Sequence, residues 1–385
     1  MICLQSDRQH PQRRRNPPIS ANRASQNVQQ QKVQQATPKM KHVLCFLCLF
    51  DGLRTPSIRR LIRKPRTVCK MPLLTFDPSF YAPSSTEAIE NVYKNVLSCT
   101  CDIYVDPGMT EVLEVLKSKG SSSHSHSNNS GPSVPERILV HYFGQGCHPP
   151  GADGSLFFFS DDRDRYRPMK ILNLIRTCSS PLCFIFDCNS AAAIEPQLKS
   201  QSDIFAFFSC EADEGLPLST DAPIDLFSSC LLSAYDTAVW WNVQKHSTIY
   251  EEPKRPKEEN NQFLSGFLHA ILDAIAYETQ DLNTYQAFTK DPAIATLFRG
   301  FALAQRVMLS FNVHSRAIPE LQQMAYHSFW DVWDIAIDCC ITLDEASAIP
   351  MLYNLCIETF ETFSSPGIFP IYSYFMKIPS HSLAA

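Results

Sequence analysis

The residues of this chain best suited to covalent chemistry stand at the carboxyl ends of two predicted strands. The first strand, at residues 137–143, runs into the loop GQG at residues 144–146, and the second, Leu182–Asp187, runs into Cys188. A cysteine nucleophile acts as its thiolate, and a nearby imidazole must take up the thiol proton. Catalytic and ligand sites of doubly wound sheets lie beyond the strand carboxyl ends. The pattern therefore indicates a place for cysteine-based catalysis, with Cys188 as the candidate nucleophile.

Apolar runs separated by helix-like segments indicate the framework that would hold these residues. Residues 43–50, 137–143, 182–187 and 204–208 are largely apolar. Such continuous runs are typical of strands covered on both faces of a parallel sheet. Between them, apolar residues recur at helical spacing. The alternation over residues 43–242 predicts a doubly wound α/β domain.

The character of the sequence changes after a polar stretch that contains proline, lysine and glutamate. Amphipathic segments beyond it predict an antiparallel array of helices, of the kind that begins an α-solenoid. We expect Pro292, Pro319 and Pro350 to stand in first turns of these helices. The predicted helices are residues 263–279, 292–311, 319–343 and 350–363. The predicted organisation is a disordered tail (1–40), an α/β domain (41–243), a linker (244–262) and a helical part (263–385).

Composition and charge argue against several classes of protein. The net charge is -5, and the basic runs at residues 13–15 and 59–66 are typical of tails and loops, so we expect no nucleic acid partner. The longest apolar run, residues 43–50, is far shorter than the about 20 residues that span a bilayer, so we expect no membrane span. The 15 cysteines form no paired CxxC motifs, so we expect neither a metal site nor a cofactor. With no secretory signal peptide, buried free thiols indicate a reducing, cytoplasmic location.

Several phrases of the sequence occur in the order found in one protein family. The chain reads HYFGQG at residues 141–146 and FDCNSAA at residues 186–192. In these phrases it resembles raptor, the regulatory subunit of target-of-rapamycin (TOR) kinase complex one, whose amino-terminal region is caspase-like. The resemblance covers roughly residues 43–345. Further phrases that carry it are residues 151–160, 209–241, 295–312 and 329–338.

The resemblance implies a caspase-like, mostly parallel sheet flanked by helices, followed by an all-α, armadillo/HEAT-like antiparallel segment. A loop followed about forty residues later by a cysteine also has the order of the caspase dyad. The family's Gly-His-Gly histidine corresponds to Gln145, whose amide has no titrating group to accept a thiol proton. Gln145 and Cys188 would then be vestigial dyad positions. The chain is expected to be a pseudo-peptidase and not an enzyme.

The resemblance also implies a scaffold of TOR complex 1 that binds the TOR kinase and helps recruit its protein substrates in growth control. We expect partner contacts at Asp187 and Asn189, and at Trp330 and Trp333, which share one helix face. Asp187, the two tryptophans and Cys188 also have a structural interpretation. Asp187 suits a helix cap, the tryptophans suit a core, and Cys188 suits a buried thiol.

An alternative stays open from the residues alone. His148 or His141 could replace the missing base, which predicts an active caspase-like cysteine peptidase that uses Cys188. We expect His141 to point into the packing layer of the sheet and His148 to lie in a loop before two prolines. The family continues into a long helical array and a WD40 propeller. The chain is therefore expected to be a divergent short form or a truncated gene model.

Overall fold

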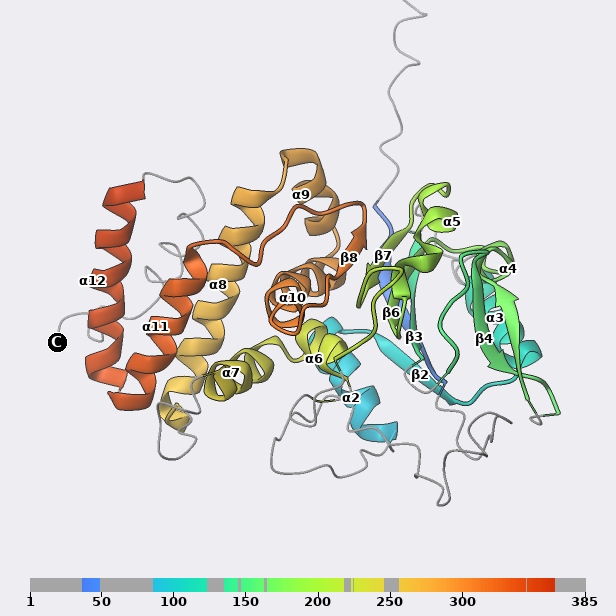
Figure 1. Cartoon of the computed structure of the whole chain (residues 1–385), viewed down its shortest axis with the longest axis horizontal. Coiled ribbons are helices and arrows are strands. Elements are labelled where there is room, and N and C mark those ends of the chain that lie inside the picture. The colour runs from blue at the N-terminus through green and yellow to red at the C-terminus, as the bar shows by residue number, and fades with distance from the viewer. Residues whose placement is uncertain are drawn as a thin grey trace, which may run out of the picture. The chain divides into compact units, whose positions relative to one another are not determined.

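The apolar runs of the sequence assemble into one six-stranded sheet (Figure 1). The computed structural model describes residues 37–48, 86–122, 135–144, 147–162, 165–217, 223, 225–245, 256–343 and 345–363. The strand order is β2-β1-β3-β6-β7-β8, and every neighbouring pair is parallel except β7 and β8, which are antiparallel. The strands are β1 (Lys39–Leu47), β2 (Thr100–Val105), β3 (Glu136–Phe143), β6 (Leu182–Asp187), β7 (Phe205–Phe208) and β8 (Arg316–Ile318).

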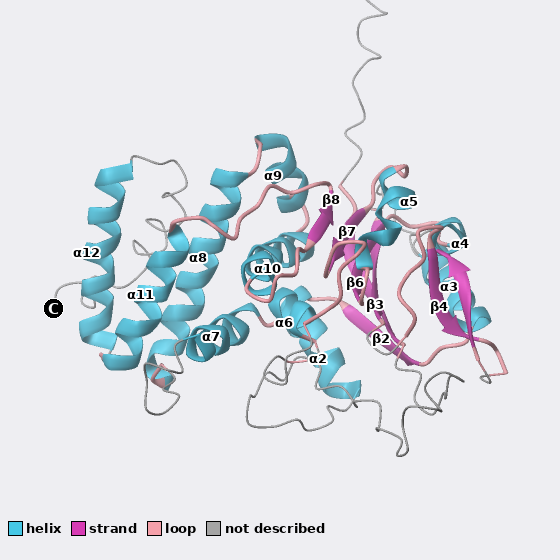
Figure 2. Ribbon diagram, viewed as in Figure 1, coloured by secondary structure: helices cyan, strands magenta, loops and turns pink. Residues whose placement is uncertain are grey.

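Helices cover both faces of this sheet, which explains the continuous apolar runs. Every residue of β6 and β7 is buried. Figure 2 shows α3, α4 and the hairpin β4-β5 on one side of the sheet, and α6 and α10 on the other. α2 packs against β2, α6 and α10. The predicted mostly parallel α/β class is confirmed. The covering elements are α2 (Thr86–Leu97), α3 (Met109–Ser122), β4 (Ser155–Phe159), β5 (Tyr166–Lys170), α4 (Ile171–Thr177), α5 (Glu195–Lys199), α6 (Leu226–Leu232) and α10 (Pro292–Leu309).

The second half of the chain is helical, but the helix predicted at residues 319–343 begins later than expected. Residues 319–328 are not helical, and α11 begins only at Phe329. Tertiary hydrogen bonds replace the helical ones here: Gln322 N donates to Gln280 Oε1 at 2.9 Å, and Met324 N donates to Gln305 Oε1 at 2.9 Å. The helices of this part besides α10 are α7 (Ala234–Lys245), α8 (Asn261–Thr279), α9 (Leu282–Thr289), α11 (Phe329–Thr342) and α12 (Glu345–Phe363).

One further helix was not predicted, and one expectation about a proline was wrong. The sequence did not predict α9, whose first turn is capped by Asp281; the Asp281 side chain accepts from Asn283 N and Thr284 N. Pro350 lies inside α12 and not in its first turn, because the helix already begins at Glu345. Pro292 does stand at the start of α10, as expected.

Strand β8 joins the two parts that the sequence separates. It follows α10 in the chain, yet Ala317 pairs with Phe207 at the edge of the sheet. Part of the predicted linker is also ordered. η2 (Glu258–Asn260) precedes α8, and the buried Asn260 side chain donates to the carbonyl of Cys340 at 2.9 Å. The described residues from Thr37 onward belong to one compact unit, so the division at 244–262 stays a prediction.

Some predicted features fall outside the described residues. Gln145 is among them, as are most of the predicted tail (residues 1–36) and residues 246–255 of the linker. The end of the tail prediction is wrong, because Lys39 and Met40 open strand β1. None of the described helices combines the length and the apolar character needed to cross a bilayer.

Candidate functional site

Cys188 follows the last residue of β6 directly, as predicted, and its exposed fraction is 0%. Its backbone is held by the residues that follow β7. The Cys188 N–H donates to Ser209 Oγ at 3.3 Å, and the Cys188 carbonyl accepts from Ser209 Oγ at 3.0 Å and from Cys210 Sγ at 3.3 Å. The candidate nucleophile is therefore packed into the core and not presented at an open strand end.

The surroundings of Cys188 keep its thiol protonated. Burial raises the pKa of Cys188 well above its ordinary range, and the nearby Cys147, Cys210 and Asp187 raise it further. Burial also raises the pKa of the neighbouring Cys147 to about 12. The thiolate is the reactive form of cysteine, so neither thiol is prepared for nucleophilic attack near neutral pH.

His141 lies on β3 and belongs to a buried hydrogen-bonded chain. His141 Nδ1 is bonded to the Tyr93 hydroxyl, and Nε2 lies 3.1 Å from Ser228 Oγ. Because the Ser228 hydroxyl gives its one hydrogen to Asp187, it accepts from His141 Nε2, and Nδ1 of a neutral ring then accepts from Tyr93. Ser228 Oγ and the Ser228 N–H in turn donate to Asp187 Oδ2. Burial lowers the pKa of His141 to about 3, which fits a neutral ring with one donor and one acceptor nitrogen. Since both ring nitrogens are engaged, His141 has none left to accept a proton from Cys188.

The neutral state of His141 predicts a loss of stability in acid. Between its folded pKa of about 3 and the unfolded value near 6.5, only the unfolded chain binds the proton, so stability falls as the pH is lowered. One proton corresponds to at most about 1.4 kcal/mol per pH unit. We expect His141→Gln to lower the free energy of unfolding at pH 7 and to flatten its slope between pH 6.5 and 4. Urea unfolding across this range measures both. Equal slopes for the variant and the parent would contradict the assignment.

His148 is placed quite differently. It is exposed, its Nδ1 lies 2.8 Å from the Pro149 carbonyl, and its ring packs on Phe157 with centroids 4.8 Å apart. The structure therefore puts this histidine in a surface loop, as the sequence predicts, while Cys188 is enclosed.

The four predicted contact residues differ in exposure. Asp187, Trp330 and Trp333 are buried, and only Asn189 is partly exposed. The Asn189 Oδ1 accepts from Leu216 N at 2.8 Å. Asp187 is bonded to Ser228, at the start of α6, and does not cap the helical turn that follows it in sequence. The buried side chains of Asp187, Trp330 and Trp333 thus belong to the core and its hydrogen bonds. A role of any of the four residues in partner binding stays a prediction.

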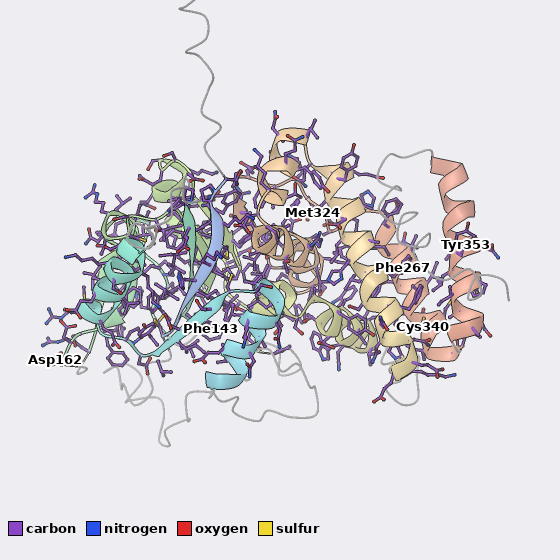
Figure 3. All side chains as sticks on the ribbon, turned by 180° about the vertical axis from the view of Figure 1, so that it is seen from behind. Phe143, Asp162, Phe267, Met324, Cys340 and Tyr353 are labelled. Atoms are coloured by element: carbon purple, nitrogen blue, oxygen red, sulfur yellow. The ribbon has the colours of Figure 1, made fainter. Side chains whose placement is uncertain are left out.

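The two tryptophans pack among the helices. Trp330 Nε1 donates to the carbonyl of Met324 at 2.9 Å. The Arg306 guanidinium lies 4.6 Å from the ring centroids of both Trp330 and Trp241. Figure 3 shows Met324 and Cys340 among the helices, whereas Phe143 marks the carboxyl end of β3 in the sheet. These contacts place Trp330 in the helical core, and Trp333, on the same helix, is completely buried as well.

Comparison with known proteins bears directly on this fold. Residues 38–198 match the family model described as the Raptor N-terminal CASPase like domain. The chain carries a raptor amino-terminal caspase-like domain. A crystal structure of raptor from Chaetomium thermophilum has the same fold, with a TM-score of 0.68 and 21% identity over 90% of this chain and 34% of that one.

Curated relatives agree with this assignment. "Regulatory-associated protein of TOR 1" of Arabidopsis thaliana is 30% identical over 78% of this chain and 23% of its own length. "Target of rapamycin complex 1 subunit mip1" of Schizosaccharomyces pombe is 27% identical over 77% of this chain and 25% of its own length. The chain thus spans about a quarter of the length of these relatives.

Sequence reasoning missed three buried residues that bond to this part of the sheet. Ser209 is bonded to Cys188, Ser228 to Asp187 and His141, and Tyr93 to His141. Two serines inside an otherwise apolar helix, Ser228 and Ser229 in LFSSCLL, were the available signal. Within the described ranges, no group of three or more His, Cys, Asp and Glu residues is arranged to hold a metal ion.

Proposed function

We propose that this chain is a non-catalytic scaffold of a TOR complex 1, which binds the TOR kinase and helps recruit its protein substrates. The observation that carries the proposal is the match of residues 38–198 to the raptor caspase-like domain. Relatives named as TOR-associated or TOR complex subunits support it. We further propose that the cell location is the cytoplasm and that Asn189 contributes to a partner contact.

The absence of peptidase chemistry rests on two independent features. Gln145 offers no proton acceptor at the position of the family's histidine. Cys188 is fully buried, and its pKa is raised by that burial. The alternative, a working cysteine peptidase that uses His141 or His148, is disfavoured because both nitrogens of His141 are bonded elsewhere and His148 is exposed, whereas Cys188 is buried.

Direct binding tests the scaffold proposal. A tagged form of the purified chain is mixed with a purified TOR kinase at low salt, and the mixture is separated by size-exclusion chromatography. We expect the chain to elute with the kinase. The control is the same kinase mixed with the tag alone. Failure of the folded chain to bind any TOR kinase would remove the proposal.

A second test installs the missing base. We expect Gln145→His to leave the chain without detectable peptidase activity, because the general base alone does not expose or ionise Cys188. The assay is cleavage of a fluorogenic peptide library, with Gln145→His/Cys188→Ser as the control. Cleavage by Gln145→His that disappears in the double variant would show that Gln145 was the sole barrier.

A further inference from the structure

The residues after β7 form a segment that lies over the end of β6. We call residues 209–217 the strap. Its first residues are completely buried, its middle is exposed at Ala212 and Asp213, and Leu216 is buried again with an exposed fraction of 6%. The segment is thus buried near both of its ends and exposed to solvent in its middle.

Hydrogen bonds fasten the strap to residues 188–192 along most of its length. Besides the bonds of Ser209 and Cys210 to Cys188, the Cys210 carbonyl accepts from Ala192 N at 3.1 Å. The Glu214 carbonyl accepts from Ser190 N at 2.8 Å, and Asn189 Oδ1 accepts from Leu216 N at 2.8 Å. Ser190 has a positive φ of 52°, and the bond to Glu214 therefore holds a turn that is unfavourable for a residue with a side chain.

A second segment, residues 314–316, follows α10 in the chain and is bonded to the strap. Both carboxylate oxygens of Glu214 are bonded to His314: Oε2 accepts from His314 N at 2.7 Å, and Oε1 contacts Nδ1. Ser315 Oγ donates to the Ser209 carbonyl at 3.1 Å, and an Arg316 guanidinium nitrogen lies 3.4 Å from Glu211 Oε1. His314 and Ser315 directly precede β8, and Arg316 is its first residue. The strap is therefore bonded to the segment that joins α10 to the edge of the sheet.

We propose that residues 209–217 are a strap that seals Cys188, and that the contact of Glu214 with His314 is its clasp. The strap blocks the strand end whatever residue stands at position 145. His314, one partner in the clasp, lies between α10 and β8. Any rearrangement of the helical part that moves residues 314–316 would therefore loosen the seal. The inference concerns access to Cys188 and does not depend on binding to a TOR kinase.

Alkylation of thiols in the native protein tests the strap. The folded chain is exposed to iodoacetamide, and the rate of modification at each cysteine is read by peptide mass spectrometry. Cys183 serves as the internal reference, because it is equally buried but lies within β6, away from the strap. In the parent protein we expect Cys188 and Cys183 to react slowly and at similar rates, because both require opening of the core.

Glu214→Ala removes the clasp. We expect it to raise the alkylation rate of Cys188 by about tenfold or more, because hydrogen bonds to a charged group are strong. The alkylation rate of Cys183 should stay unchanged. Asp213→Ala is the matched control, since it removes an exposed carboxylate from the same strap. Ser315→Ala gives a second, milder variant should Glu214→Ala fold poorly. Rapid modification of Cys188 in the parent, an unchanged rate at Cys188 in both Glu214→Ala and Ser315→Ala, or an equal acceleration of Cys188 and Cys183 in these variants would overturn the proposal.

Discussion

Replacing Asp187 by alanine is expected to lower the free energy of unfolding by about 3 to 5 kcal/mol, since two bonds to a buried carboxyl group are lost. Asp187 is completely buried, and its Oδ2 accepts from both the N–H and the hydroxyl of Ser228. Without the carboxyl group, both donors are left in a core that offers water no access. The loss also reaches His141, which bonds to the same hydroxyl. Urea unfolding at pH 7 measures the effect.

Asp187→Asn provides the control for size. Its side-chain oxygen can accept from Ser228 with nearly the same shape, so we expect a clearly smaller loss than in Asp187→Ala. Ser228→Ala removes one donor and leaves the other, and it should fall between the two. If Asp187→Ala were as stable as the parent, the buried chain from Tyr93 to Asp187 would have no structural importance.

Replacing Gly300 by valine is expected to destabilise the chain by about 3 kcal/mol, the upper range for overpacked cores. Gly300 lies in α10 where this helix crosses α6. A Cβ at this position would lie 2.5 Å from Leu231 Cα and 2.6 Å from the Leu231 carbonyl oxygen. These are backbone atoms, which do not move aside as the end of a flexible side chain would. The two helices must therefore separate.

The alanine variant decides between two opposing effects at the same residue. Helix propensity alone predicts that Gly300→Ala stabilises α10 by about 1 kcal/mol. The close approach of Leu231 predicts a net loss, and we expect the loss to prevail because the contact is with backbone. Gly215→Ala is a suitable control, since a Cβ there meets only Asn189 Oδ1 at 3.4 Å. Thermal unfolding of the three variants tests the order, and a gain in stability for Gly300→Ala would contradict the packing argument.

The buried chain and the strap show how far sequence patterns reach in this protein. The run at residues 182–187 predicted β6 with its bounds, because continuous apolar character is a local property of a strand covered on both faces. The position of Cys188 followed from the same pattern. Its burial did not, because residues bonded to it lie about twenty positions further along the chain, in the strap.

The helical half contains a segment whose structure the sequence pattern predicted wrongly. Residues 319–328 carry a pattern compatible with a helix, and Pro319 suited a first turn. In the structure the preceding residues extend the sheet as β8, and residues 319–328 bond to α8 and α10. The amphipathic period describes which side of a helix is apolar, but it does not decide which backbone groups find partners elsewhere.

The sequence by itself determined the strand and helix alternation, the strand-end cysteine, and the resemblance to raptor through ordered phrases. These are features of consecutive residues, so they can be recognised from the sequence alone. Only the tertiary structure decided that His141 is a neutral core residue, that Cys188 is buried, and that a segment from beyond α10 completes the sheet. Each of these depends on groups brought together from distant parts of the chain, since desolvation and hydrogen bonding act through space and not along the sequence.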